Sequence, residues 1–283
     1  MLIDEDKFKI NKVLDRINEK INAHDDSREL SLTELSEIAG FSERQFSRVF
    51  PRYLSDSFNK YYSTLRLEYA AHLLKTTNLS VLAISEKIGY SSAPALNKEF
   101  KKRFETSPIQ FRATHQLQPF ETAFREFENV QLTAIHLIYN SSITNYNQCV
   151  SADFEQQNWD ELELEAQRLG VALENHGYWG ICFDDSNVRF AEACRYYACV
   201  EVTKSLKNQD KINSLTVPAG KYAQFTHKGS YDLLESLYED VYRQALFSNQ
   251  LTLRSGLVLE KYLNSVANTS EADLLTEVYF PIK

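Results

Sequence analysis

A pattern that occurs twice, 49 residues apart, most restricts the fold of the first part of this chain. Residues 31–40 read SLTELSEIAG and residues 80–89 read SVLAISEKIG. The two segments share their first serine, a central Ser-Glu pair and the closing glycine. After each glycine come an aromatic residue, a serine and a second segment with helical periodicity, which ends on Phe50 or Phe100. A short helix, a tight turn and a second helix are the elements of a helix-turn-helix, so the sequence predicts two of them.

The residues within each repeat suit these roles. Ser31 and Ser80 can cap the first helix of each unit, because a serine oxygen accepts a free N–H of the first turn. Gly40 and Gly89 stand where the chain leaves that helix, at a position where glycine adopts a left-handed backbone at little cost. The buried stripes of the two first helices are expected to be Leu32, Leu35 and Ile38 in one unit, and Val81, Ile84 and Ile88 in the other.

The second helix of each unit separates an apolar face from a polar one. Phe46, Val49 and Phe50 are expected to bury in the first unit, as are Leu96, Phe100 and Phe104 in the second. The expected outward residues are Arg44, Ser47, Arg48 and Arg52 in the first unit, and Ala93, Pro94, Asn97, Lys98, Lys101 and Lys102 in the second. Outward Arg and Asn can pair with base edges, whereas Lys and Arg near helix ends can meet phosphates.

A single amphipathic helix would not distinguish DNA binding from an ordinary protein surface. Two units at one offset, joined by a long helix expected over residues 57–75, do favour DNA binding. Such a pair can address consecutive major-groove faces about one turn, ~34 Å, apart without a dimer. Double-stranded DNA is therefore the expected partner.

The charge distribution supports this interpretation. The whole chain carries a net charge of −8, but residues 43–112 hold 12 Lys and Arg against 6 Asp and Glu. Residues 116–283 hold 13 basic against 23 acidic residues. A basic segment beside an acidic one is the expected pattern when one domain meets phosphate and the other does not.

The second part of the chain predicts a different fold. We expect a helical DNA-binding domain over residues 1–113, a linker over 114–122 and a second domain over 123–283. Strand-like runs alternate there with two helices, one around Trp159 and one around Val241. Their order, β-α-β-β twice, predicts an α+β domain built from two similar halves. The expected strands are Val130–Tyr139, Tyr178–Phe183, Arg195–Thr203, Lys221–His227, Gly256–Leu263 and Leu274–Ile282.

Several classes of protein are disfavoured. No stretch approaches the ~20 apolar residues of a membrane span, and the acidic N-terminus does not resemble a signal peptide. The four cysteines form no CxxC pair, so we expect reduced thiols, a cytoplasmic protein and no zinc ribbon. No nucleophile triad, HExxH or phosphate loop is evident, so we expect neither an enzyme nor a bound cofactor or metal.

Residues 31–112 resemble the DNA-binding domain of the AraC/XylS family. The resemblance rests on SLTELSEIAGFSERQFSRVF, on YYSTLRLEYAAHLL, and on a last unit that passes Phe104 and Ser107-Pro108 and closes on Phe111-Arg112. It implies that Arg44, Ser47, Arg48, Ala93, Pro94, Asn97 and Lys98 face the groove, and that RNA polymerase is a further partner. Family members often carry polar residues where Ala93 and Pro94 stand. Since neither can donate a hydrogen bond to a base, we expect the second unit to clamp phosphate or contact a thymine methyl group.

Residues 119–283 resemble the GyrI-like effector-binding domain, which also follows an AraC-type domain in Rob-type regulators. The resemblance rests on VPAGKYA from Val217, HKGSY from His227, LEKY from Leu259 and EVYFPI from Glu277. It implies a pocket between the halves in which a glutamate, here Glu260, and aromatic side chains receive a cationic, apolar effector. A carboxylate beside aromatic faces favours such a cation through charge pairing and cation–π attraction. The expected aromatic residues are Trp159, Tyr178, Trp179, Tyr222 and Tyr262.

Other interpretations stay open at this point. Each aromatic residue alone is more often core than pocket. Glu260 beside a tryptophan would also suit a general base that hydrolyses a small electrophile. The acidic second domain would also permit binding of a protein partner.

Overall fold

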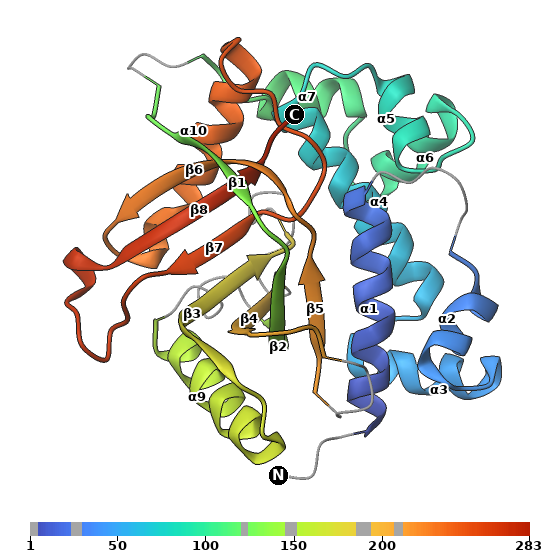
Figure 1. The fold of residues 1–283 in the computed structure, drawn as a ribbon. Coiled ribbons are helices and arrows are strands. Elements are labelled where there is room, and N and C mark those ends of the chain that lie inside the picture. The colour runs from blue at the N-terminus through green and yellow to red at the C-terminus, as the bar shows by residue number, and fades with distance from the viewer. Residues whose placement is uncertain (1–4, 24–29, 120–123, 145–151, 185–193, 207–211) are drawn as a thin grey trace. The chain divides into compact units, whose positions relative to one another are not determined.

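The computed structural model describes residues 5–23, 30–119, 124–144, 152–184, 194–206 and 212–283. The chain divides into two compact units, Met1–Gln118 and Pro119–Lys283. The first is helical and the second is an antiparallel sheet with helices, which confirms the expected fold class (Figure 1). Of the expected linker, Thr114 and His115 belong to the last helix of the first unit, and residues 120–122 lie outside the described residues.

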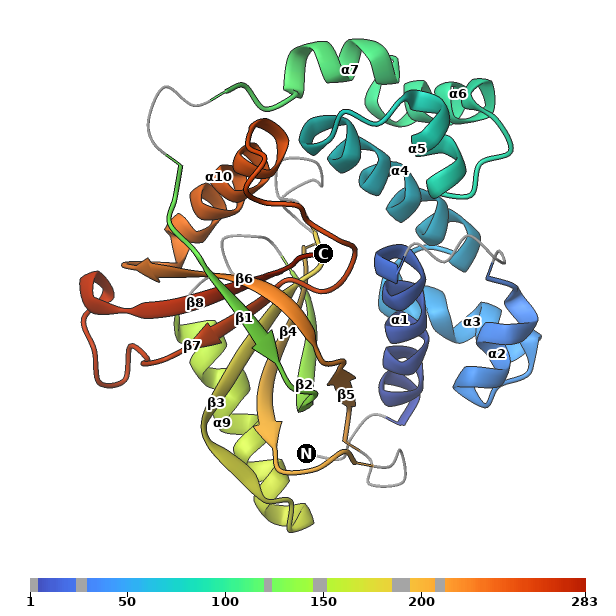
Figure 2. The ribbon, with the colours of Figure 1, turned by 45° about the horizontal axis from the view of Figure 1, so that its top comes forward.

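The helices of the first unit follow the predicted order. They are α1 (Glu5–Ala23), α2 (Leu32–Ala39), α3 (Glu43–Leu54), α4 (Phe58–Thr76), α5 (Val81–Lys87), α6 (Ala93–Phe104) and α7 (Pro108–His115). Helices α2 and α3 form the first helix-turn-helix, and α5 and α6 form the second. Helix α4 runs between the two pairs (Figure 2).

Both repeats use the same local contacts. The Oγ atoms of Ser31 and Ser80 accept the N–H of the third residue beyond, at 3.0 and 3.1 Å. Gly40 and Gly89 both have left-handed backbones, with φ of 64° and 73°. The predicted caps and turns are therefore confirmed at both positions.

The buried faces are those that the periodicity indicates, except that Leu32, Ile38, Val81 and Phe104 are half-buried. Phe46, Val49 and Phe50 of α3 are buried against α1, α2 and the first half of α4. In the second helix-turn-helix, Phe100 of α6 contacts Phe104 and Phe111, with ring centroids 4.5 and 5.4 Å apart. Each recognition helix is thus fixed by aromatic side chains on its inner face.

The second unit is one antiparallel sheet in the strand order β1-β6-β8-β7-β3-β4-β2-β5. Within the described residues its helices are α9 (Ala152–Leu169) and α10 (Leu234–Phe247), with short 3-10 turns at Tyr231–Leu233 and Glu271–Asp273. Its strands are β1 (Glu128–Leu132), β2 (Ile135–Thr144), β3 (Leu173–Cys182), β4 (Cys194–Val202), β5 (Ser214–Val217), β6 (Gly220–Lys228), β7 (Leu259–Tyr262) and β8 (Leu275–Pro281).

The two predicted halves are β2-α9-β3-β4 and β6-α10-β7-β8, and they join where β3 pairs with β7. Each half is preceded by a strand that pairs with the other half: β1 pairs with β6, and β5 pairs with β2. The single strand expected over Val130–Tyr139 is therefore wrong. The chain leaves one ladder after Leu132 and enters another at Ile135, because β1 and β2 have different partners.

The two faces of the sheet carry separate apolar clusters. Helices α9 and α10 cover one face, where Trp159, Leu237 and Val241 pack against strand residues such as Val200. We call this the helix-covered face. On the opposite face Leu137, Trp179 and Tyr222 belong to a second cluster. Alternation along each strand decides which face a side chain joins.

None of the helices within the described residues is long and apolar enough to cross a membrane.

Candidate functional site

The outer faces of α3 and α6 are polar and accessible. Arg44, Ser47, Arg48 and Arg52 of α3 are all exposed, and their inner-face neighbours are buried. On α6, Ala93 is half-buried, whereas the other expected residues are exposed: Pro94, Asn97, Lys98, Lys101 and Lys102. Pro94 lies in the first turn of α6, where its missing N–H leaves no intrahelical bond unmade. The structure therefore leaves both rows open to a nucleic-acid partner.

Arg66 of the connecting helix α4 holds the turn of the second helix-turn-helix. Its guanidinium donates to the carbonyl oxygens of Ile88 and Gly89. The same group lies over the ring of Tyr90, 4.4 Å from its centroid. The sequence repeat gave no indication of this contact, because Arg66 lies between the two copies.

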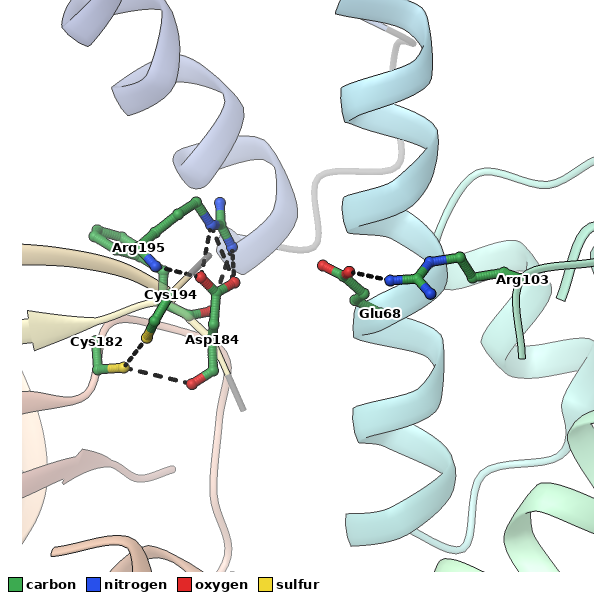
Figure 3. A network of polar contacts seen from close by, with 7 residues as sticks. Glu68, Arg103, Cys182, Asp184, Cys194 and Arg195 are labelled. Atoms are coloured by element: carbon green, nitrogen blue, oxygen red, sulfur yellow. Dashed lines mark hydrogen bonds and ion pairs between the residues drawn. The ribbon is translucent and has the colours of Figure 1, made fainter. Parts of the chain in front are cut away.

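A second contact joins α4 to the recognition helix α6. Arg103 Nη2 donates to Glu68 Oε1 at 3.1 Å (Figure 3). The Glu68 side chain is only 8% exposed and that of Arg103 is 22% exposed, so water screens the pair weakly. Arg103 therefore fixes α6 from its inner side, while Lys101 and Lys102 remain outside.

In the second unit, Glu260 lies where the two halves meet. Strand β7 places it opposite Gly180 of β3, and its side chain is buried on the helix-covered face. Tyr262 donates to its Oε2 at 2.6 Å, and Tyr238 of α10 donates to its Oε1 at 2.7 Å. The hydroxyl of Tyr196 lies 3.1 Å from that of Tyr262 and extends the network.

Gly180 is required by this arrangement. A Cβ atom at this position would lie 2.8 Å from the Tyr262 hydroxyl and 3.0 Å from Glu260 Oε2. The Tyr196 hydroxyl would be closer still. The glycine therefore provides the space that the three polar groups occupy.

Burial and hydrogen bonding act on Glu260 in opposite directions. Burial raises the pKa of its carboxyl, and the hydrogen bonds from Tyr262 and Tyr238 lower it, with a net rise. The pKa of Tyr238 lies well above its usual range, because of burial and the nearby Glu260 charge. Tyr238 thus keeps its proton as a donor to Glu260.

Aromatic rings lie around this network. The ring of Trp159 on α9 is 4.8 Å from that of Tyr262 and 5.2 Å from that of Tyr178. Tyr178 donates to Glu163, and burial and this contact raise its pKa to about 12. Tyr231, the last residue of the HKGSY motif, was not among the expected pocket residues, but its ring packs edge-on against that of Tyr262 at 4.9 Å. Trp159, Tyr178 and Tyr262 therefore share the helix-covered face with Glu260.

The other two expected aromatic residues lie elsewhere. Trp179 and Tyr222 are on the opposite face of the sheet, so the expectation that they surround Glu260 is wrong. The reason is that successive residues of a strand face opposite sides of the sheet. Trp179 is next to Gly180, which lies opposite Glu260, so the Trp179 side chain lies on the other face. Its Nε1 donates to Glu201 at 2.9 Å, and Lys261 lies 5.2 Å above its ring.

This arrangement suits recognition of a positive charge. Burial removes the water that would stabilise the ionised carboxylate, and a bound cation would stabilise that form instead. Aromatic rings in general attract a positive charge over their faces, and several rings lie next to Glu260. The described residues contain no group of three or more His, Cys, Asp or Glu that could hold a metal.

Comparisons with known proteins agree with the division of the chain into a helical first unit and a second unit built on a sheet. The family described as "GyrI-like small molecule binding domain" matches residues 125–283, and a "helix-turn-helix domain" family matches residues 35–114. An uncharacterized HTH-type transcriptional regulator of Staphylococcus aureus (strain COL) is 28% identical over 177 residues. That match covers 62% of this chain and 22% of the relative, so the chain spans about a fifth of the relative's length.

Two solved structures are similar to separate parts of the chain. A transcriptional regulator with an AraC-type DNA-binding domain from Chromobacterium violaceum is 30% identical, with a TM-score of 0.35. It covers 40% of this chain and 95% of its own. A protein solved bound to tetraphenylphosphonium is 19% identical, with a TM-score of 0.41. It covers 56% of this chain and 94% of its own.

Proposed function

The chain belongs to the family of GyrI-like small-molecule-binding domains, here joined to an AraC-type helix-turn-helix domain, and we propose that it regulates transcription in response to an amphiphilic cation. In this proposal α3 and α6 bind DNA, and Glu260 with its aromatic neighbours binds the effector. RNA polymerase is the proposed further partner of the DNA-bound protein.

The observation that carries the DNA-binding part is the repeated helix-turn-helix with two exposed polar rows. Arg44 and Arg48 are exposed on α3, and Arg pairs bidentately with guanine, which supports base readout by this helix. On α6, Asn97 is flanked by Lys98, Lys101 and Lys102, whereas Ala93 and Pro94 donate no hydrogen bond. We therefore assign base readout mainly to α3 and phosphate clamping mainly to α6.

Selection of bound sequences from a random DNA pool tests this assignment. The full chain is expected to enrich a site whose specific positions lie on one major-groove face, with a less specific stretch about one turn away. The pool is selected with and without tetraphenylphosphonium. Absence of any enriched sequence would contradict the assignment of base readout to α3.

The observation that carries the effector part is the buried carboxylate of Glu260, 5% exposed, among tyrosine hydroxyls and aromatic rings. Tetraphenylphosphonium is a suitable probe, because it is permanently charged and has no hydrogen-bond donor. Glu260→Gln keeps the shape of the side chain and removes its charge. The affinity for the probe is expected to fall more than about tenfold, which corresponds to about 1.4 kcal/mol.

Glu201→Gln provides a matched control. Glu201 lies in the same sheet, but it faces the other way and accepts a hydrogen bond from Trp179. Its substitution is expected to leave probe affinity unchanged in isothermal titration. Equal affinity of Glu260→Gln and the parent would refute the effector site. Turnover of a small electrophile would support a hydrolase instead. Absence of binding to every cation tested would support a protein partner.

A further inference from the structure

Two thiols lie in contact beside the Glu260 network. Cys182 ends β3, Cys194 begins β4, and their Sγ atoms are 3.7 Å apart (Figure 3). The ladder pairs Cys182 with Tyr196, so Cys194 occupies the diagonal position on the same face. Cys194 is 3% exposed and Cys182 is half-buried, so Cys182 is the more exposed residue of the pair.

The surroundings favour protonated thiols. The hydrogen bond with Cys194 raises the pKa of Cys182 well above its usual range, and burial and the charges of Cys194, Glu260 and Asp184 act in the same direction. Asp184 itself is bound by Arg195, whose Nη2 lies 2.7 Å from Oδ1. Peroxide and most soft metal ions react with thiolates, so this pair is poorly suited to either.

Trivalent arsenic bound to oxygen can take up two thiols with no net change of charge. An organoarsenical R–As=O condenses with two S–H groups to give R–As joined to two sulfurs, and one water leaves. Both thiol protons go to that oxygen, and arsenic stays trivalent, so no oxidant or reductant takes part. The net reaction therefore starts from two protonated thiols and releases both of their protons in one water molecule.

The number and spacing of the sulfurs fit this ligand class. One organic group leaves two bonds on trivalent arsenic, and two thiols are present. A disulfide would need the sulfurs to approach to about 2.05 Å, whereas a bridging arsenic accepts sulfurs near contact distance. Within the described residues no third metal-binding side chain joins the pair, as a tetrahedral zinc site would require.

We propose that Cys182 and Cys194 form a binding site for trivalent organoarsenicals, in which one arsenic atom bridges the two sulfurs. Cys182 condenses first, because it is the more accessible, and Cys194 closes the ring. The site uses neither the charge of Glu260 nor a cation, so its failure and that of the proposed effector site are separable.

Phenylarsine oxide and the reduced full chain provide the test. Intact mass is expected to show one phenylarsenic group per chain, retained against excess 2-mercaptoethanol and released by 1,2-ethanedithiol. Cys182→Ser and Cys194→Ser are each expected to weaken retention about a hundredfold or more. The second thiol acts at an effective concentration in the millimolar range or above, and each variant loses that advantage.

Two other cysteines provide matched controls. Cys199 is buried in the cluster on the opposite face, and Cys149 lies outside the described residues. Cys199→Ser and Cys149→Ser should keep the adduct. Digestion of the parent adduct should yield one arsenic-linked pair of peptides containing Cys182 and Cys194, a result that does not depend on any variant folding. Absence of an adduct, retention in either single variant, or linkage through Cys149 or Cys199 would overturn the proposal.

Discussion

Gly180 of β3 lies directly opposite Glu260 of β7 in the ladder that joins the two halves of the second unit. The carboxylate and the Tyr262 and Tyr196 hydroxyls fill the space that a side chain at position 180 would take. Residues from both halves are therefore needed to form the polar network.

Gly180→Ala is expected to destabilise the second unit by about 1–3 kcal/mol, the usual cost of overpacking a filled core. The nearest atoms are hydroxyls on rigid rings that are themselves buried, so they cannot swing away cheaply. Thermal unfolding followed by circular dichroism measures the loss. Alanine at Gly170, where a Cβ would meet nothing within 4 Å, is a control for space, although its left-handed φ of 65° adds some strain. A variant as stable as the parent would show that the side chains around Gly180 can move to make room for the methyl group.

Cation affinity is expected to rise with pH. The carboxyl of Glu260 has a raised pKa, so it is partly protonated at pH values where an ordinary glutamate is ionised. Only the ionised form attracts tetraphenylphosphonium, so affinity increases as the pH rises through the raised pKa. Binding should also release a proton, which titrations in buffers of different ionisation enthalpy detect. Glu260→Gln should show a flat profile over the same range.

Stability has the opposite pH dependence. The folded chain holds the Glu260 proton more tightly than the unfolded chain, because its folded pKa is raised. The parent should therefore lose stability relative to Glu260→Gln as pH rises from about 4, the ordinary glutamate range, to the raised pKa. Melting temperatures of both proteins across this window provide the measurement. A constant difference between them would mean that Glu260 does not titrate abnormally.

Arg48→Ala and Lys101→Ala should affect DNA binding in different ways. If Arg48 reads a guanine, its loss costs about 1–3 kcal/mol at the preferred site and relaxes one base preference. Loss of Lys101 should weaken all sequences alike and reduce the slope of log K against log salt by about one. Binding to specific and random DNA at several salt concentrations separates the two. Equal loss on both DNAs for Arg48→Ala would make it a phosphate contact.

Arg103→Met should destabilise the first unit by about 1–3 kcal/mol. The change keeps the apolar stem but removes the guanidinium from the nearly buried Glu68 carboxylate. Adding Glu68→Gln should recover part of the loss, since the double variant no longer buries that charge. Urea unfolding of the parent, both single variants and the double variant completes the cycle. If the double variant is no more stable than Arg103→Met, the buried charge is not the cause.

The helical unit was predictable because its signals are local and occur twice. Serine caps, turn glycines and the phase of Phe46 and Phe50 each follow from a few neighbouring residues, and the structure confirms them. The hydrogen bonds that join α4 to the second helix-turn-helix were not predictable in this way. Arg66 and Glu68 contact residues 22 to 35 positions away, and no periodicity indicates such partners.

In the second unit, the positions of the strands were easier to predict from the sequence than the pairing between them. Alternation found β4, β6 and β8 nearly to the residue, but it missed β5, whose four residues are too few to show a period. It also grouped Trp179 with Glu260, although Trp179 adjoins the glycine that faces Glu260 and so lies on the other side. Tyr196 and Tyr238 join Glu260 only through tertiary pairing, so no sequence pattern could identify them.

The crossing of β1 and β5 has a consequence for how this unit is assembled. Each half completes its outer edge with a strand that the chain supplies just before the other half begins. During synthesis the first half is complete before β5, the neighbour of β2, has been made. Strand β1 can pair only once β6 has been made, more than 80 residues later. Such long loop closures are entropically costly, so this unit is expected to fold slowly and as a whole. A chain cut between β4 and β5 would leave two pieces that must find each other before either edge is closed.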